Sequence, residues 1–364
     1  MTSYARGVTP RVQRARERAL IEAARLGETH LHLSTMDGEV LGLGAYHFLP
    51  SAAEGRPRAG VVGGAASARA PELWRRNTGG RAIACGDGFL IVTLALPHRA
   101  ALVGESAWDL KPEQVMNRCV RGFLAACRNL GLDPTYPGLD LLTLRRKAFA
   151  HLSFGEEDDG PTLFQIVVGV TASLAGTPSL LDRLDPHGVV PATLIEAGSV
   201  TTLADELGEA AVHEALAALA DPGDCVALVA AGYADSFPLE LLELDPAVTE
   251  AMLEEEPAER AGSSPWTSAA DPGASTATAH GLLGPVSASI GAAAGKISAA
   301  QLSGDFIAPA WVVARLCDRL VGTRLDRGAI TRRVEDVLDD GGRAYLLGIR
   351  PAALADLIAL AAGL

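Results

Sequence analysis

Apolar residues recur every three to four positions over residues 112–130, the spacing of an amphipathic helix that buries one face. Pro112 suits the first turn of that helix and Gly131 its C-terminal cap. A similar pattern over 11–26 predicts a second helix with its arginines outward. Short apolar or alternating runs predict strands at 30–34, 38–48, 60–63, 89–97, 139–143, 144–154, 163–172 and 224–231.

Further helices are expected near 178–184, 203–220 and 239–256, and the acidic stretch 156–160 predicts a hairpin turn. The segment 257–280 is dense in Pro, Gly, Ser, Thr and Ala, which predicts an interdomain linker. After it, two strands around a turn at 291–295 precede helices near 309–321, 329–338 and 351–361.

This order predicts an α+β fold of mixed or antiparallel sheets flanked by helices, without the regular strand–helix alternation of a doubly wound sheet. We expect a larger domain at 1–256, the linker at 257–280 and a small α+β domain at 281–364. Alternation places Phe164, Ile166 and Val168 on one strand face, where they are expected to line a pocket for an apolar chain.

Composition narrows the functional classes. The 364 residues carry a net charge of −13, which disfavours general binding to nucleic acid or to an anionic membrane. No apolar run reaches the ~20 residues of a membrane span, and residues 1–18 do not resemble a secretory signal. The five cysteines are widely spaced and form neither a disulfide framework nor a metal knuckle, so a reducing, cytoplasmic location is expected.

Two basic segments are candidates for chemistry. The run Arg75-Arg76-Asn77-Thr78-Gly79-Gly80-Arg81 combines paired glycines, which admit close approach to backbone N–H groups, with guanidiniums suited to phosphate; it is also compatible with a tight turn and a solvated basic rim.

The second segment is Arg145-Arg146-Lys147. Strand alternation would place Arg145 and Lys147 on one face. Only three of the 31 basic residues are lysines, so the compact charge of Lys147 suggests a specific contact with carboxylate and phosphate oxygens. An ordinary charged residue on an edge strand is the alternative.

Histidines offer little: His30 and His32 share a strand face without a third ligand nearby in sequence, and no metal site is expected.

The two basic segments, in this order and about seventy residues apart, resemble the signature of the lipoate–protein ligases, within the biotin/lipoate ligase superfamily. Asp140-Leu141 precedes Lys147 as in that family, and Gly295-Lys296-Ile297 with Gly304-Asp305-Phe306 resembles its small C-terminal accessory domain. Gly198-Ser199-Val200 and Ser263-Ser264-Pro265-Trp266 resemble further family segments, so the resemblance extends over nearly the whole chain.

The resemblance implies an enzyme that uses ATP and Mg²⁺ to convert lipoate, or a similar medium-chain acid, to an acyl-adenylate. The acyl group then passes to a lysine of an acceptor lipoyl domain, of the kind found in 2-oxoacid dehydrogenase subunits or the glycine cleavage H protein. Lys147 would be catalytic, and the implied substrate- and nucleotide-binding residues are Arg76, Thr78, Gly79, Gly80, Arg81, Cys85, Gly88, Asp140 and Ala150.

Several family positions carry other residues here, among them Arg81 in place of a third glycine. Two alternatives therefore stay open. One is a non-catalytic protein that binds acyl groups or nucleotides on the same scaffold. The other is an octanoyl-type acyltransferase that uses Cys85 as a nucleophile.

Overall fold

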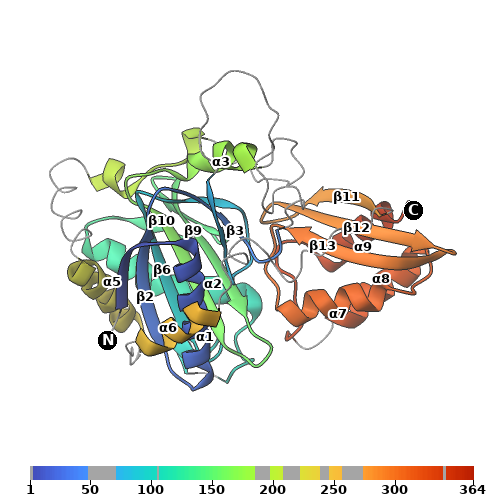
Figure 1. The fold of residues 1–364 in the computed structure, drawn as a ribbon, viewed down its shortest axis with the longest axis horizontal. Coiled ribbons are helices and arrows are strands. Elements are labelled where there is room, and N and C mark those ends of the chain that lie inside the picture. Colours follow the sequence, from blue (N-terminus) through green and yellow to red (C-terminus); the bar gives the residue numbers. More distant parts are fainter. Residues whose placement is uncertain are drawn as a thin grey trace.

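The computed structural model describes residues 3–47, 71–104, 106–184, 197–207, 222–237, 246–255, 274–338 and 342–364. Its central feature is a seven-stranded sheet with the order β1-β2-β6-β10-β9-β8-β7 (Figure 1). The strands are β1 (Ser3–Val8), β2 (His30–Met36), β6 (Phe89–Leu96), β7 (Pro134–Thr135), β8 (Leu141–Leu144), β9 (Lys147–Glu156) and β10 (Thr162–Gly169). Only β1 and β2 pair in parallel, so the sheet is mixed.

The two faces of this sheet are covered differently. Helices α2 (Pro112–Asn129) and α5 (Pro222–Ser236) close one face, where they share a hydrophobic core with β6, β9 and β10. Helix α1 (Pro10–Arg25) covers part of the other, beside a three-stranded sheet of order β4-β3-β5. Its strands are β3 (Glu39–Leu43), β4 (Glu72–Arg75) and β5 (Ile83–Gly86), and the short helix α3 (Thr177–Leu184) packs on it.

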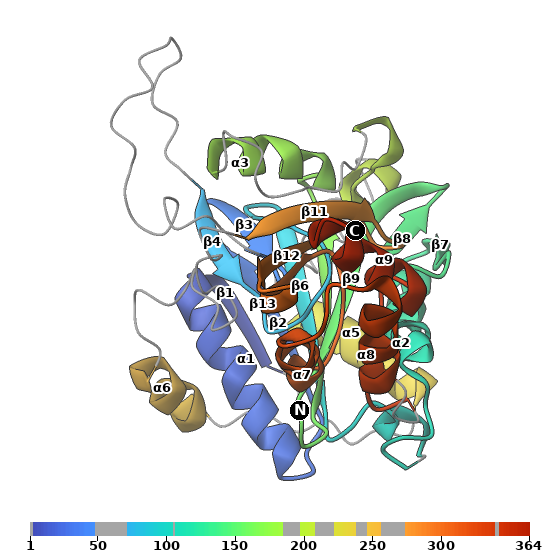
Figure 2. The ribbon, with the colours of Figure 1, turned by 90° about the vertical axis from the view of Figure 1, so that its right-hand side faces the viewer.

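The C-terminal part forms its own antiparallel sheet, β11-β12-β13, with three helices (Figure 2). The elements are β11 (Ser275–His280), β12 (Pro285–Ala293), β13 (Lys296–Gly304), α7 (Ala310–Leu320), α8 (Arg327–Leu338) and α9 (Pro351–Ala361). They enclose a second hydrophobic core. We call residues 275–364 the C-terminal unit. The α+β class with mixed and antiparallel sheets is thus confirmed.

The predicted linker 257–280 lies partly outside the described residues. Its end, Ser275–His280, forms β11, the outer strand of the small sheet. Alternating Thr and Ala side chains suit a strand that packs on one face only, which composition alone did not reveal. The division into domains near residue 256 stays a prediction, as does the strand at 60–63, which the structure does not describe.

The strand predicted at 224–231 is wrong, because these residues belong to helix α5. A short apolar run fits a buried helix as well as a buried strand. What selects the helix is its contact with α2: a Cβ at Gly232 would lie 2.4 Å from the Gly122 carbonyl oxygen, and one at Gly122 would lie 2.4 Å from the Tyr233 ring. Two glycines therefore let the helix backbones approach closely.

The boundary predicted between 143 and 144 is also wrong. Leu144 pairs with Lys147, and Arg145 and Arg146 form the two-residue turn between β8 and β9, both with positive φ (45° and 68°). A two-residue hairpin turn with positive φ at both positions favours Asn-Gly, so the sequence carried no turn signal here.

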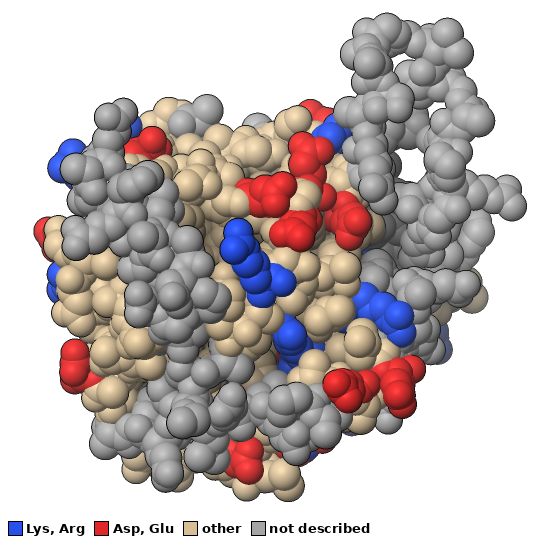
Figure 3. Space-filling model, turned by 60° about the vertical axis from the view of Figure 1, so that its left-hand side comes forward, with Lys and Arg blue, Asp and Glu red and all other residues tan. Residues whose placement is uncertain are grey.

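No helix within the described residues is long and apolar enough to cross a membrane. On the face shown in Figure 3, a group of acidic side chains lies next to basic side chains, with uncharged residues around them.

Candidate active site

The turn between β4 and β5 carries the arginine–glycine motif, and its backbone is held by protein carbonyl groups. The Gly79 N–H donates to the Phe154 carbonyl at 3.1 Å, and the Gly80 N–H donates to the Phe306 carbonyl at 2.8 Å. A Cβ at Gly79 would lie 2.4 Å from that same Phe306 oxygen. Gly80 adopts a φ of +85°, which favours glycine. In this conformation, the backbone that lies close against the paired glycines is that of Phe306 in the C-terminal unit.

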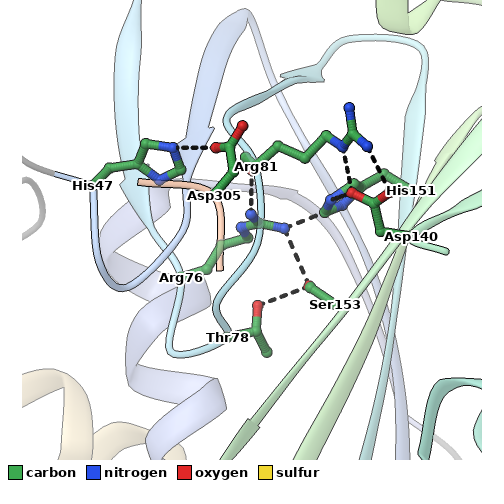
Figure 4. A network of polar contacts seen from close by, with 8 residues as sticks. All are labelled: His47, Arg76, Thr78, Arg81, Asp140, His151, Ser153 and Asp305. Carbon is green, nitrogen blue, oxygen red and sulfur yellow. Dashed lines mark hydrogen bonds and ion pairs between the residues drawn. The ribbon is translucent and has the colours of Figure 1, made fainter. Parts of the chain in front are cut away.

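Arg76 lies at the centre of a buried polar network on the α1 side of the sheet (Figure 4). One of its Nη groups donates to the Arg81 carbonyl, and the other lies 3.1 Å from Ser153 Oγ and 3.3 Å from His151 Nδ1. Its Nε has no hydrogen-bond partner in the described structure. Burial lowers the pKa of Arg76 to about 10, so it stays charged at neutral pH.

Asp140, just before β8, forms a buried ion pair with Arg81. The carboxylate accepts from Nε and, at 2.8 Å, from Nη2 of the guanidinium. Burial acts to raise the pKa of Asp140, but the polar contact with His151 and the hydrogen bonds and charge of Arg81 outweigh it and leave that pKa below its ordinary value. The bulky Arg81 thus neutralises a buried carboxylate.

His151 connects these two arginine sites. Its Nε2 lies 3.6 Å from Asp140 and its Nδ1 faces Arg76. Burial lowers the pKa of His151 to about 4, so the ring is neutral at pH 7, with Nδ1 able to accept from Arg76 and the proton on Nε2. All direct contacts of the Arg76 guanidinium are therefore to uncharged acceptors. A buried cation of this kind favours binding of an anion.

A buried hydrogen bond joins the segment after β3 to the C-terminal unit. His47 Nε2 lies 2.8 Å from an oxygen of Asp305, and both side chains are buried. Beside them, the Tyr46 ring stacks on Phe306 with centroids 4.6 Å apart. Asp305 and Phe306 belong to the Gly304-Asp305-Phe306 segment singled out in the sequence.

Lys147 lies outside this network. It is exposed at the first position of β9, four residues from His151, or about 13 Å along the strand. An extra residue in β9 shifts its register with β8. As a result Ala148 belongs to the core on the α1 side, whereas Leu144, the partner of Lys147, belongs to the core under α2. Lys147 therefore lies on the strand face opposite the arginine network. The expectation that Arg145 and Lys147 share a strand face is wrong, since Arg145 lies in the turn. Strand β9 also lies between β10 and β8 and is no edge strand.

The remaining predicted residues lie within packed structure. Cys85 is buried in β5, and burial raises the pKa of its thiol to about 12. Gly88 forms the turn before β6 with a φ of +82°, and its carbonyl accepts from Val170 N at 2.9 Å. Ala150 is fully buried in the core under α2.

The strand 162–169 also differs from expectation. Phe164, Ile166 and Val168 share a face, but that face is filled by the core under α2 and α5, opposite the arginine network. Gln165, on the other face, pairs with Ser153 and contacts Thr78.

Sequence reasoning missed His151, Ser153 and Gln165. A usable signal was present, since His151 and Ser153 are polar residues two positions apart in an otherwise apolar strand.

Within the described residues, no group of three His, Cys, Asp or Glu side chains is placed to hold a metal ion. Mg²⁺ is often bound through substrate phosphates and one or two carboxylates, so a nucleotide-dependent reaction does not require such a group.

The sequence matches no protein-family model, and no curated protein matches it. Solved structures do resemble the fold. LipL1 of P. falciparum, in complex with lipoate, aligns over 100% of this chain and 99% of its own, with 10% identity and a TM-score of 0.55. A bipartite lipoate protein ligase with its E2 lipoyl domain from Thermoplasma acidophilum aligns over 70% of this chain and 91% of its own (15% identity, TM-score 0.47).

Lipoate-protein ligase A bound with ATP aligns over 70% of this chain and 94% of its own, with 14% identity and a TM-score of 0.46. Biotin protein ligase from Leishmania major is more distant, at a TM-score of 0.31. The chain therefore has the fold of the lipoate–protein ligases, with both the mixed-sheet part and the small C-terminal unit.

Proposed function

We propose that this protein is an ATP-dependent ligase that activates lipoate, or a similar medium-chain acid, and transfers it to a lysine of an acceptor lipoyl domain. The observation that carries the proposal is the full-length fold similarity to LipL1 in complex with lipoate. Acceptors of this chemistry are the lipoyl domains of 2-oxoacid dehydrogenase subunits and the H protein type of the glycine cleavage system.

The buried charge of Arg76 supports this proposal. Its guanidinium contacts only uncharged acceptors, and its Nε is free within the described structure. A phosphate oxygen of ATP would accept from this Nε and place a negative charge in direct contact with the guanidinium. For such an oxygen to reach the N–H of Gly80, the Phe306 carbonyl has to withdraw. Movement of the C-terminal unit is therefore part of the proposal.

In the proposed reaction, a carboxylate oxygen of the acid attacks the α-phosphorus of ATP, and pyrophosphate leaves as the acyl-adenylate forms. The amine of the acceptor lysine then attacks the acyl carbon, loses a proton and releases AMP. Lys147 is exposed but lies about 13 Å along β9 from His151, so the start of β9 would have to move toward the ligand before its compact charge could stabilise the acyl and phosphate oxygens. Mg²⁺ would accompany the phosphates of ATP and reduce their charge.

A second function is supported by one observation. The N–H groups of Gly79 and Gly80 both donate to protein carbonyls, and Arg81 is committed to Asp140. A protein that binds acyl groups or nucleotides without catalysis would not need the N–H groups of this turn to be available to a substrate. The acyltransferase alternative is disfavoured, because a buried thiol with a pKa of about 12 is protonated at neutral pH and is a poor nucleophile.

Acyl-dependent exchange of pyrophosphate into ATP tests the proposal, with lipoate and octanoate as the acids. We expect exchange in the wild type and a loss of about 100-fold or more in both Lys147→Arg and Lys147→Ala. Lys296→Ala is the matched control, since Lys296 is also exposed at the start of a strand but lies in the C-terminal unit. Full activity in Lys147→Arg would remove the catalytic assignment. Nucleotide binding without exchange would establish the non-catalytic function, and absence of both would overturn the proposal.

A further inference from the structure

Glu17 is a fully buried carboxylate on α1, directly beneath the arginine–glycine turn. One oxygen accepts from the Asn77 backbone N–H at 3.2 Å and from Asn77 Nδ2 at 2.9 Å. The other accepts from Gln165 Nε2 at 2.8 Å and from Gln13 Nε2 at 3.5 Å. All four donors are uncharged amides, so the carboxylate is held by hydrogen bonds that a neutral side chain of similar shape could not all accept.

The same carboxylate determines the direction of a chain of hydrogen bonds that ends at Arg76. Burial raises the pKa of Glu17, and the hydrogen bonds to it act in the opposite direction. Because N–H groups donate to both of its oxygens, Glu17 acts as an acceptor, so Gln165 turns its NH₂ group toward it and its Oε1 toward Thr78, whose hydroxyl donates at 2.8 Å. The single Thr78 proton is then used. Ser153 must therefore donate to Thr78 Oγ1, 2.9 Å away, which leaves Ser153 Oγ to accept from Arg76 Nη1 at 3.1 Å.

We infer that Glu17 is a positioning residue, which sets the conformation of the Asn77–Gly80 turn and orients Thr78, Ser153 and the Arg76 guanidinium through one directional hydrogen-bond chain. The position of the turn depends on Glu17 through Asn77, and the orientation of the cation depends on it through Gln165. Hydrogen bonds in such a chain polarise one another, so reversal of one amide affects the whole chain. The consequence for nucleotide binding rests on the proposed function; the consequence for the turn does not.

Glu17→Gln tests the inference with a side chain of nearly the same shape. The NH₂ group of the new side chain would face either Gln165 Nε2 or the Asn77 donors. Two N–H donors would then point at each other, and one hydrogen bond would be lost. Glu22→Gln is the matched control on the same helix, because Glu22 is only half-buried and pairs with Arg25 rather than with the turn. The double variant Glu17→Gln, Gln165→Glu is the rescue. There the amide introduced on α1 donates to the carboxylate introduced on β10, and that carboxylate still accepts from Thr78, so the direction of the chain is kept. Only the long contact with Gln13 Nε2, at 3.5 Å, loses its acceptor.

The first measurement is amide hydrogen exchange by mass spectrometry on the free protein, which requires no substrate. In Glu17→Gln we expect exchange across 75–82 to be about 10-fold to 100-fold faster, with α9 unchanged. Glu22→Gln and the double variant should exchange like the wild type. Unchanged exchange across 75–82 in Glu17→Gln, or equal acceleration in α9, would overturn the inference. Failure of the double variant to restore protection would do the same.

The second measurement separates this inference from the proposed function. If the wild type catalyses pyrophosphate exchange, Glu17→Gln should raise KM for ATP about 10-fold or more, leave KM for the acid within about twofold, and be corrected in the double variant. Unchanged KM for ATP would overturn the role of Glu17 in nucleotide binding. A wild type without exchange or nucleotide binding would refute the proposed function, and the hydrogen-exchange result would still decide the role of Glu17 in the turn.

Discussion

The ion pair between Arg81 and Asp140 gives the sharpest energetic test of the buried network. In Asp140→Asn the side chain keeps its shape but loses the charge that balances Arg81, whose side chain is 9% exposed. The guanidinium is then left in the interior, close to the equally buried Arg76. Breaking a buried pair by removing one partner costs about 3–5 kcal/mol, and we expect a loss of that size in the free energy of unfolding.

Urea denaturation followed by circular dichroism measures this loss. Asp356→Asn is the control, since its pair with Arg327 is exposed on both sides (61% and 66%) and should be worth under about 1 kcal/mol. The double variant Arg81→Met, Asp140→Asn removes the unpaired cation and should recover most of the lost stability. The reasoning is refuted if Asp140→Asn costs less than about 1 kcal/mol, or if the double variant is less stable than Asp140→Asn.

Three further predictions concern neighbouring groups. Burial lowers the pKa of His151 from 6.5 to about 4 on folding, so below pH 6.5 the unfolded protein binds a proton that the folded protein does not. The free energy of unfolding should therefore be full above pH 6.5 and fall by on the order of 3 kcal/mol as the pH falls toward 4, and denaturation curves for His151→Gln should depend less on pH in that window. Gly79→Ala places a Cβ against the Phe306 carbonyl, and hydrogen exchange at 305–307 should accelerate, whereas unchanged exchange would mean that the contact yields without cost. Cys85 should resist thiol reagents in the native protein, and Cys85→Ala should keep any pyrophosphate exchange; rapid modification of Cys85 in the folded protein would revive the acyltransferase alternative.

The sequence by itself determined the elements whose periodicity is long and whose ends carry local signals. Helix 112–130 was predicted within one residue, because its apolar stripe and its flanking Pro112 and Gly131 act locally. The last three helices, predicted near 309–321, 329–338 and 351–361, also lie within two residues of their predicted ends. The motif around Arg76 and Asp140 was also recognisable as a candidate site, since its residue types and order carry the family resemblance.

Only the tertiary structure decided what those residues contact. Gly79 and Gly80 admit either a ligand or another stretch of backbone, and the position of Phe306, more than two hundred residues away, selects the second. Arg81 pairs with Asp140, fifty-nine residues away in the chain, and an extra residue in β9 turns Lys147 to the strand face opposite the network. Likewise, 224–231 belongs to a helix that packs on α2, where Gly122 and Gly232 allow the two backbones to approach closely. Local pattern specifies which face a residue favours, whereas contacts between distant segments specify which partner satisfies its charge, its hydrogen bonds and its volume.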